Sequence, residues 1–398
     1  MKVLVIHNFH RKGSASGDDQ VYKNETALLE DNGVDVIKYT VINDSFDNSN
    51  VFEKVAATFG MLWSFKHYYS VKKVIKREHP DIVHIHTFFP LLSPSILYAG
   101  KRAGCKVIAT LHDTRFICPC ATSLRERTLC NECGDGKYFR MFKYKCFKGS
   151  RFQSLIVAFI FKYHRIRKTF YRQIDKYICL NDNQIKLLRD IGFDENKIVK
   201  KYNFVKDSVE ILEEKQVELP KLPERYVVYF GRLGEEKGIH VLMSAWEDLD
   251  DIPIVVMGAG PLEEEFNAWA QDKKQVICLG HTEHSKCMKI VTNSEFVFFP
   301  SVCYEGCSMV VIEAESLSKP IVATDLGFAS EAIIDDYNGV KVKLNDVEGF
   351  KNAVRMLWSD TSKCRQMGKN ARMDYENKYT LERNFKQLEA IYNNKIEL

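Results

Sequence analysis

Short apolar runs alternate with stretches of helical periodicity along the whole chain. In the first half the apolar runs lie at residues 3–6, 34–39, 81–86, 107–111, 177–180 and 198–202. In the second half they lie at residues 226–230, 254–257, 276–279, 296–299, 321–323 and 340–342. Strands that are apolar throughout and alternate with helices are typical of parallel sheets covered on both faces. The pattern therefore predicts an α/β fold built on doubly wound parallel sheets.

The pattern is interrupted between residues 206 and 224. This segment is charged and contains Leu-Pro-Lys-Leu-Pro, which is typical of a linker. A chain of 398 residues is also too long for one hydrophobic core. We therefore expect two Rossmann-like domains, residues 1–205 and 206–379. The last helical stretch, about 352–391, is long enough to leave the second domain, so residues from about 380 to 398 are assigned to the first.

Two carboxylates flank a strand-to-helix connection in the second half. Glu305 follows the apolar run 296–299 and is expected on a loop at its carboxyl end, whereas Glu313 is expected a turn or two into the next helix. Ligands of open α/β sheets bind at that edge, and the backbone N–H groups that open the helix would form an anion site. These N–H groups belong to Gly306, Cys307, Ser308, Met309 and Val310. The arrangement suits a nucleotide sugar, and the alternative is an ordinary connection with surface glutamates.

Three further strand ends in the second half carry candidate binding residues. Arg232 and Lys237 flank the loop after residues 226–230, where two fixed cations beside helix N–H groups would neutralise a diphosphate. Gly258 and Gly260 follow residues 254–257 and allow close backbone approach. His281 follows residues 276–279, and the backbone there could frame a base. The alternative interpretations are, in the same order, a solvated loop with scattered charges, a tight strand-to-helix turn and a surface histidine.

The first half offers a long polar loop and a histidine at strand ends. The loop runs from His7 to Gly17 and includes Asn8, His10, Lys12, Gly13, Ser14 and Ser16. Gly17 could let the backbone approach a phosphate or sugar, or be an ordinary loop glycine. His112 ends the strand 107–111 and could orient a sugar or accept a proton. His84 and His86 share one strand face and are interpreted mainly as structural.

Four cysteines have the spacing of a metal site. Cys118, Cys130, Cys133 and Cys146 form C-x11-C-x2-C-x12-C, and four thiolates that include a C-x2-C pair fit a structural tetrahedral zinc site. Cys120 is a fifth candidate. The alternative is thiols packed as small apolar residues. Twelve cysteines in a chain that begins directly with a strand and shows no signal peptide indicate a reducing compartment.

Charge is distributed unevenly. The net charge is only +4, yet residues 137–174 contain eleven Lys or Arg and no Asp or Glu. Phe and Tyr are interleaved with these cations, a composition that suits an anionic membrane surface. The alternatives to membrane binding are that the segment binds nucleic acid or is simply a solvated helix face. The longest apolar run there, residues 155–161, is much shorter than the roughly 18 residues of a membrane span, so we expect peripheral association.

Taken together, these motifs resemble the retaining glycosyltransferases of family 4, which have the GT-B fold. The resemblance covers nearly the whole chain. It rests on Gly231-Arg232-Leu233, Glu236-Lys237-Gly238, Gly258-Ala259-Gly260-Pro261, Pro300-Ser301, Glu305-Gly306, Glu313-Ala314, Lys319-Pro320-Ile321-Val322-Ala323-Thr324-Asp325 and Asn338-Gly339. Cys307-Ser308 stands where Phe-Gly is common, and Ser316-Leu317-Ser318 where Ala-Cys-Gly is common, which affects the expected shape of the sugar pocket.

The resemblance implies roles for individual residues and for the two domains. Arg232 and Lys237 would hold the donor diphosphate, and Glu313 would bind the ribose. Glu305 would lie beside the donor sugar, and His112 resembles the family's histidine at the reaction centre. The N-terminal domain would bind the acceptor and the C-terminal domain the donor, across a central cleft. UDP is expected as the donor nucleotide because it is the commonest in the family.

The family's chemistry retains the anomeric configuration without an enzyme nucleophile. The diphosphate leaves and the acceptor hydroxyl enters on the same face, so stabilisation of the leaving group and positioning carry the reaction. No metal is required where cations already sit on the phosphate. Asp248-Leu249-Asp250 matches the Asp-x-Asp of metal-dependent transferases, but it precedes the strand 254–257 and is interpreted as unrelated to catalysis.

The sequence therefore predicts a cytoplasmic, peripherally membrane-associated, retaining glycosyltransferase that extends a surface polysaccharide or glycolipid. Its expected partners are a nucleotide-diphosphate sugar, a saccharide or lipid-linked saccharide acceptor and an anionic membrane surface, but not nucleic acid. One alternative is a nucleotide-sugar isomerase or hydrolase on the same fold, which would need more carboxylates than the strand ends offer. The other is a non-enzymatic membrane-binding or nucleic-acid-binding scaffold that uses residues 137–172.

Overall fold

The chain forms two compact units in the computed structural model. The structure describes residues 1–10, 16–43, 60–126, 128–213 and 217–394, so Lys12, Gly13 and Ser14 of the polar loop lie outside the described residues. The first unit comprises Met1–Ser123, Cys130–Lys201 and Phe385–Leu398, and the second comprises Leu124–Leu129 and Tyr202–Asn384.

Each unit is built on a six-stranded sheet in which all paired strands are parallel. The first sheet has the order β2-β1-β3-β4-β7-β8 and the second β11-β10-β9-β12-β13-β14. The strands of the first sheet are β1 (Lys2–Phe9), β2 (Asp35–Ile42), β3 (Ile82–Thr87), β4 (Lys106–Leu111), β7 (Lys176–Cys179) and β8 (Ile198–Lys200). Those of the second are β9 (Val227–Phe230), β10 (Ile254–Met257), β11 (Val276–Gly280), β12 (Val297–Phe299), β13 (Ile321–Thr324) and β14 (Gly339–Val342). The predicted α/β fold with two parallel sheets is confirmed.

Helices connect the strands. In the first unit they are α1 (Gly17–Asp31), α3 (Phe65–Glu78), α4 (Ser95–Arg102), α5 (Arg140–Tyr144), α6 (Arg151–Ile166), α7 (Thr169–Gln173), α8 (Asp182–Asp190) and the 3₁₀ turn η2 (Glu195–Lys197). In the second they are α9 (Ser208–Glu213), η3 (Glu235–Lys237), α10 (Ile239–Ala245), α11 (Glu263–Ala270), α12 (His284–Asn293), α13 (Met309–Ser316), α14 (Gly327–Ala332), α15 (Val347–Ser359) and α16 (Thr361–Lys378). The remaining elements are the two-residue strands β5 (Leu124–Arg125) and β6 (Thr128–Leu129) and the helix α17 (Leu381–Tyr392), along which the chain returns to the first unit.

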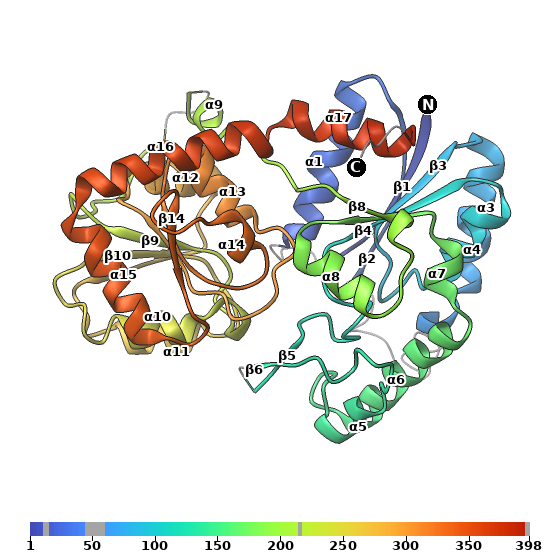
Figure 1. Cartoon of the computed structure of the whole chain (residues 1–398), viewed down its shortest axis with the longest axis horizontal. Coiled ribbons are helices and arrows are strands. Elements are labelled where there is room, and N and C mark those ends of the chain that lie inside the picture. Colours follow the sequence, from blue (N-terminus) through green and yellow to red (C-terminus); the bar gives the residue numbers. More distant parts are fainter. Residues whose placement is uncertain (11–15, 44–59, 127, 214–216, 395–398) are drawn as a thin grey trace. The chain divides into compact units, whose positions relative to one another are not determined.

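Alternation along the strands explains why helices cover both faces of each sheet. In β1, Val3 and Val5 pack with α1 and α17, whereas Leu4 and Ile6 pack with α3 and α4, because successive side chains of a strand point to opposite faces. Figure 1 shows α1 and α17 on one side of the first sheet and α3 and α4 on the other, and in the second unit α10 and α11 on one side and α12 and α13 on the other. Each unit is thus doubly wound.

The structure adds detail to two predictions of local structure. The segment 206–224 is not only a linker, because it contains α9, where Ser208 accepts a hydrogen bond from Ser316, and Asp207 just before this helix pairs with Arg372. The stretch 352–391, which was expected to be helical, is divided among parts of α15, α16 and α17. Asp360 ends α15 and caps α16, since its side chain accepts a hydrogen bond from the N–H of Lys363 at 2.9 Å.

Candidate active site

The carboxyl ends of β9 and β12 form the ligand-binding edge that the topology of the second unit predicts. β9 pairs with β10 on one side and with β12 on the other, so the strand order reverses between β9 and β12. Open α/β sheets bind ligands at such a reversal, outside the carboxyl ends of the strands. The loops that carry Lys237 and Glu305 follow these two strands.

Lys237 and Glu305 are in direct contact. The Nζ atom of Lys237, at the end of η3, lies 2.6 Å from Oε1 of Glu305, and the hydroxyl of Ser301 donates to the same oxygen at 2.8 Å. The side chains of Lys237 and Glu305 are 28% and 11% exposed. Each residue was predicted from the sequence, but their pairing was not. An anion that approaches Lys237 here shares that cation with the carboxylate of Glu305.

The side chain of Lys237 is protonated at neutral pH. Burial disfavours its ammonium form, but the nearby groups of Glu305 and Cys303 outweigh burial and raise the pKa of Lys237 above its ordinary value. Arg232 supplies a second cation on the same loop, with a side chain 55% exposed and a guanidinium nitrogen 3.3 Å from Oε1 of Glu236. The loop therefore carries one half-buried and one exposed cation.

Glycines let the neighbouring loops pack closely around these cations. A Cβ atom on Gly258 would lie 1.8 Å from the carbonyl oxygen of Gly231, and a Cβ on Gly238, whose φ is +75°, would lie 1.9 Å from that of Pro300. Neither position can hold a larger residue without moving the backbone. The structure thus gives Gly258 a packing role, and its contact with a ligand stays a prediction. Pro261 precedes the start of α11 at Glu263.

Glu313 meets a histidine that the sequence did not single out. Its Oε1 lies 2.9 Å from Nε2 of His284, the first residue of α12. The Glu313 carboxylate is 13% exposed and the His284 ring 55%. The predicted residue His281 lies just after β11 and is exposed, but the histidine that contacts Glu313 is His284. Because the pair joins α12 to α13, only the packing of these two helices could have indicated it.

The start of α13 holds the other predicted binding residues. Ser308 precedes the helix, Met309 and Val310 form its first turn, and both are half-buried. The side chain of Cys307 is buried, and its sulfur accepts a hydrogen bond from the N–H of Asn203 at 3.4 Å. A ligand would therefore meet the backbone of Cys307 more readily than its thiol.

His112 lines a small pocket at the carboxyl edge of the first sheet. Asp113, Arg115 and His86 contribute polar groups to the same pocket, and Phe116 is among its apolar residues. Burial, together with the neighbouring His86, holds the pKa of His112 well below its ordinary value. His112 is therefore neutral at pH 7, so its ring has one nitrogen that donates and one that accepts a hydrogen bond.

A buried network orients His112. Nε2 of His112 lies 3.1 Å from Nδ1 of His86, whose Nε2 lies 3.1 Å from Oε1 of Glu25. Burial opposes the charge of Glu25, but Lys201 at 2.9 Å and the two histidines hold the pKa of the carboxyl well below its ordinary value. An ionised Glu25 accepts the proton of His86 Nε2, and in the tautomer that this contact favours Nδ1 of His86 accepts a hydrogen bond from His112. In this pattern Nε2 of His112 carries the proton that it donates to His86. The Nδ1 atom of His112 therefore holds the lone pair.

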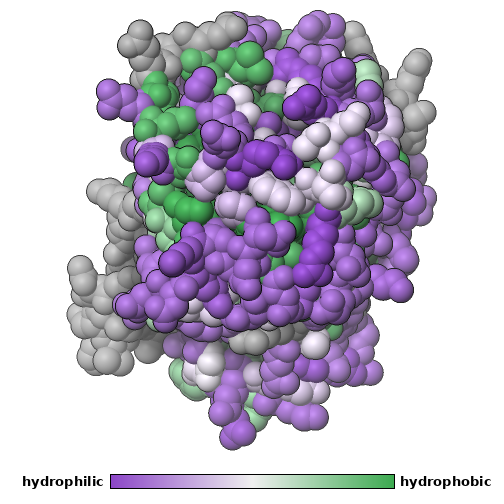
Figure 2. Space-filling model, turned by 90° about the vertical axis from the view of Figure 1, so that its left-hand side faces the viewer, coloured by the Kyte–Doolittle hydropathy of each residue, from purple (hydrophilic) through white to green (hydrophobic). Residues whose placement is uncertain are grey.

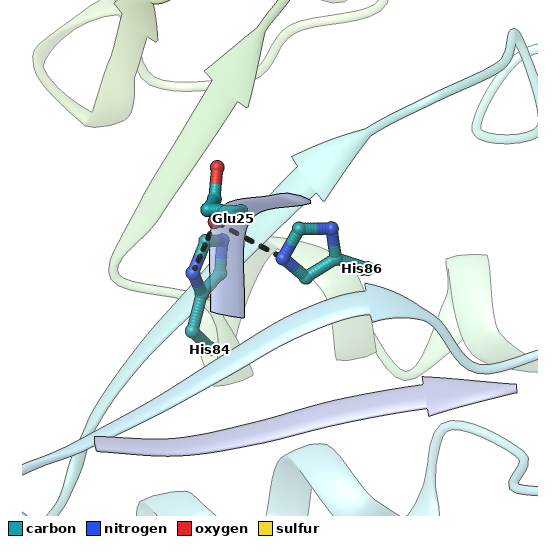
Figure 3. A group of neighbouring side chains, drawn as sticks. All are labelled: Glu25, His84 and His86. Atoms are coloured by element: carbon teal, nitrogen blue, oxygen red, sulfur yellow. Dashed lines mark hydrogen bonds and ion pairs between the residues drawn. The ribbon is translucent and has the colours of Figure 1, made fainter. Parts of the chain in front are cut away.

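Glu25, His84 and His86 also form a cluster with ligand atoms close enough for a metal ion (Figure 3). The cluster does not fit a cation, because its polar atoms already have partners. His84 contacts Tyr392 and Thr110, each at 2.8 Å, and Glu25 holds the Lys201 ammonium. A metal ion would have to displace these groups and lie beside a buried ammonium. We interpret the cluster as the support of His86.

The polar loop after β1 is described only in part. Asp19 of α1 accepts a hydrogen bond from the N–H of His10 at 3.2 Å and lies 2.8 Å from Nε2 of His7. The hydrogen bond to Asp19 raises the pKa of His10 despite partial burial. Gly17 begins α1, and among the described residues no atom lies within 4 Å of the position that a Cβ would take there. Its predicted contact with a ligand stays a prediction.

Asp248 and Asp250 are engaged away from these edges. Asp248 pairs with Lys351 of α15, and Asp250 accepts a hydrogen bond from Gln275 at 3.0 Å. Both carboxylates precede β10, at the amino end of that strand, whereas the candidate ligand loops follow the carboxyl ends.

Two Rossmann-like units with parallel sheets and charged groups at their carboxyl edges define a protein with the GT-B fold. Residues 29–209 match the family model described as Glycosyltransferase Family 4, and residues 210–374 match the model described as Glycosyl transferases group 1. Together the two models cover most of the sequence, and the chain belongs to glycosyltransferase family 4.

Similar curated proteins include two bacterial glycosyltransferases. The chain is 29% identical to D-rhamnosyltransferase WbpZ of Pseudomonas aeruginosa over 164 residues, which is 40% of this chain and 43% of WbpZ. It is 26% identical to the capsular polysaccharide biosynthesis glycosyltransferase CapM of Staphylococcus aureus over 221 residues, 53% of this chain and 56% of CapM. The chain thus spans about half the length of these curated relatives. The structure of Anabaena Alr3699/HepE in complex with UDP and glucose aligns with a TM-score of 0.64 at 17% identity, covering 98% of this chain and 99% of that one.

Proposed function

We propose that this protein is a retaining glycosyltransferase that moves a sugar from a nucleotide diphosphate to a saccharide acceptor in polysaccharide or glycolipid biosynthesis. The observation that carries the proposal is the contact of Lys237 with Glu305 at the reversal of strand order in the second unit. It puts a fixed cation beside a carboxylate, where a diphosphate and the hydroxyls of its sugar can bind together. The names of WbpZ and CapM support the same class of reaction.

The proposed mechanism relies on electrostatic stabilisation. The bond between the anomeric carbon and the diphosphate breaks with its electron pair on the diphosphate, where Lys237 and Arg232 stabilise the charge. The acceptor hydroxyl bonds to the same face of the anomeric carbon, and its proton passes to the departing diphosphate. Glu305 accepts a hydrogen bond from the sugar, and Glu313, oriented by His284, accepts from the ribose. We propose that His112 of the first unit also takes part in the reaction.

The two cations take the place that a metal ion has in other transferases, so we propose that transfer needs no metal. We propose UDP as the donor nucleotide, and the complex of Alr3699/HepE with UDP and glucose supports this choice. The test is transfer from nucleotide sugars to a saccharide acceptor, with the anomeric configuration of the product read by NMR. Retention is expected. An inverted product would contradict the mechanism, and conversion of the donor without any transfer would favour the isomerase or hydrolase alternative.

We further propose that the acceptor is linked to a lipid and that α6 holds the protein on the inner face of the cell membrane. One face of α6 is buried, while five large apolar side chains on the other face are exposed. They are Phe152, Leu155, Phe159, Tyr163 and Ile166, and their spacing of three and four residues places them in one stripe. Exposed cations follow or flank the stripe, including Lys148, Arg151 and Arg167, so an anionic lipid surface complements it.

The second unit has no comparable stripe among the residues that the structure describes. Its exposed large apolar side chains are Val209 of α9, Met373 of α16, and Ile334 and Tyr337 in the connection between α14 and β14. The left-hand side of Figure 1, seen face-on in Figure 2, is covered mainly by hydrophilic residues. Among the described helices, none combines the length and the apolar content needed to cross a bilayer.

Replacing Phe152 and Phe159 together by aspartate should weaken binding to phosphatidylglycerol-containing vesicles at least tenfold. Each aromatic side chain contributes up to about 1.5–3 kcal/mol when buried, and tenfold corresponds to about 1.4 kcal/mol. Flotation with and without the anionic lipid measures the effect. Met373→Asp, an exposed apolar position of the second unit, is the control and should bind normally. Equal binding of the wild type to neutral and anionic vesicles would contradict the proposal.

A further inference from the structure

Five of the twelve cysteines lie in the connection between β4 and α6, residues 112–150. Apart from the short elements β5, β6 and α5, the described part of this connection has no regular structure. Connections of this length in a compact domain are uncommon and are usually functional or held by specific ties. The structure of the connection therefore requires an explanation beyond secondary structure.

The thiols of this connection gather in one place. The thiols of Cys118 and Cys120 lie close enough to interact directly. The side chain of Cys133 interacts electrostatically with Cys118, Cys146 and Cys130, and that of Cys120 with Cys118, Cys146 and Cys133. The chain thus brings together sulfurs from positions as far apart as 118 and 146.

Their exposure does not fit thiols that act as small apolar residues, which are among the most buried side chains in proteins. Cys133 is buried, but Cys118, Cys120 and Cys130 are half-buried and Cys146 is exposed. Thiols that gather without being buried gain little from apolar packing. A bound ion that links them would account for their convergence.

The surrounding backbone supports sulfur ligands. The N–H of Ala121 donates to the carbonyl of Cys118 at 2.7 Å, and the N–H of Cys130 donates to the carbonyl of Ser123 at 2.8 Å, so backbone hydrogen bonds tie the segments of Cys118 and Cys130 together. The carbonyl of Cys133 accepts from the N–H of Gly136 at 2.9 Å, in the turn that follows the C-x2-C pair. Arg140 acts electrostatically on Cys133, which would partly balance a negatively charged site.

We propose that Cys118, Cys130, Cys133 and Cys146 bind one zinc ion as thiolates and that the ion holds this connection in place. A Zn–S distance of about 2.3 Å in a tetrahedral site puts the sulfurs about 3.8 Å apart. Among the described residues, Glu25, His84 and His86 are the one set of three whose ligand atoms all lie within 4.8 Å of one another. The sulfurs therefore draw together on binding, and metal binding is coupled to folding of the connection.

The first test is made on the wild-type chain, purified without chelators. We expect one zinc ion per chain by elemental analysis. After removal of the zinc under reducing, anaerobic conditions, added Co²⁺ should give the intense visible bands of tetrahedral thiolate coordination. Zinc well below one per chain together with the absence of these bands would overturn the proposal. So would an intact-protein mass that shows disulfides in place of thiols.

Variants then test which thiols are ligands. Cys130→Ser and Cys146→Ser should each weaken Co²⁺ binding at least tenfold, and Cys120→Ser should keep it. The control is Cys278→Ser, at an exposed thiol of β11 in the second unit, which should also keep it. Full Co²⁺ binding by both Cys130→Ser and Cys146→Ser would overturn the proposal. Loss in Cys120→Ser with retention in Cys118→Ser would overturn the assigned ligand set.

Discussion

Replacement of Lys237 by alanine is expected to lower the kcat of sugar transfer by about 10²–10³-fold, the usual effect of removing one preorganised group that stabilises developing charge. Lys237 is the half-buried cation of its loop, and its ammonium is stable because Glu305 lies 2.6 Å away. Loss of the cation removes stabilisation of the leaving diphosphate, where the transition state gains charge. Steady-state kinetics with a fixed acceptor measure the effect. Glu305→Gln, which keeps the shape of the carboxyl, should also lower kcat strongly.

The control for this experiment is another lysine of the second unit. Lys273 forms an ion pair with Glu247 at 2.9 Å, and its side chain is 21% exposed, so Lys273→Ala removes a paired lysine outside the candidate site. It should leave kcat within about twofold, and the melting temperatures of both variants should show that the fold persists. Wild-type kcat in Lys237→Ala would contradict the role of this residue.

Glu25→Gln is expected to lower the free energy of unfolding of the first unit by about 3–5 kcal/mol, the range found when one member of a buried ion pair is removed. Glu25 and Lys201 are each 1% exposed, so glutamine takes the compensating charge away from a buried ammonium. Hydrogen exchange measures the loss, because peptides of β3 report on the first unit and those of β10 on the second. Glu30→Gln on the same helix removes a pair in which both side chains are 43% exposed and should cost less than about 1 kcal/mol.

The same network predicts a dependence on pH. Burial lowers the pKa of His84 from 6.5 to about 3, so below pH 6.5 the unfolded chain binds a proton that the folded chain does not. The stability of the first unit should therefore fall as pH falls below 6.5. Glu25, with a folded pKa well below 4.5, adds a further loss below pH 4.5. The Glu25→Gln variant should lack the additional loss of stability below pH 4.5. A free energy of unfolding of the first unit that does not change between pH 7 and pH 4 would contradict this prediction.

Glu25→Gln also tests the path from Glu25 to His112. A glutamine can donate to His86 as well as accept from it, so the tautomer of His86, and with it that of His112, is no longer fixed. The acidic limb of the pH profile of kcat should shift. A merely structural role of Glu25 would lower stability and leave the profile of the remaining folded enzyme unchanged.

The strands could be predicted from the sequence because both faces of each sheet are covered. The central strands therefore appear as apolar runs, as Val227–Phe230 and Ile321–Thr324 do, whereas exposed and half-buried residues mix along the edge strand β2. The boundary between α15 and α16 was missed although its signal was present. Asp360 before Thr361 is a residue that favours an N-cap, but the helical periodicity on both sides concealed it.

The candidate site could be predicted only one strand at a time. Glu305 and Lys237 were identified because each follows an apolar run, yet their contact depends on β9 and β12 being neighbours, which short apolar runs do not specify. Glu25 was missed because a glutamate in an amphipathic helix usually faces solvent. Its burial becomes visible only when Lys201, far along the chain, lies beside it.

Calorimetric titration of the purified protein with UDP, GDP and ADP and their common sugar conjugates, without added metal, tests the proposed donor site most directly. We expect one diphosphate nucleotide to bind selectively and Arg232→Ala to lose that binding. Arg355→Ala, on α15 with a guanidinium 2.8 Å from the carbonyl oxygen of Asp248, should bind as the wild type does. Absence of binding to every nucleotide, or unchanged binding by Arg232→Ala, would contradict a donor site at the ends of β9 and β12.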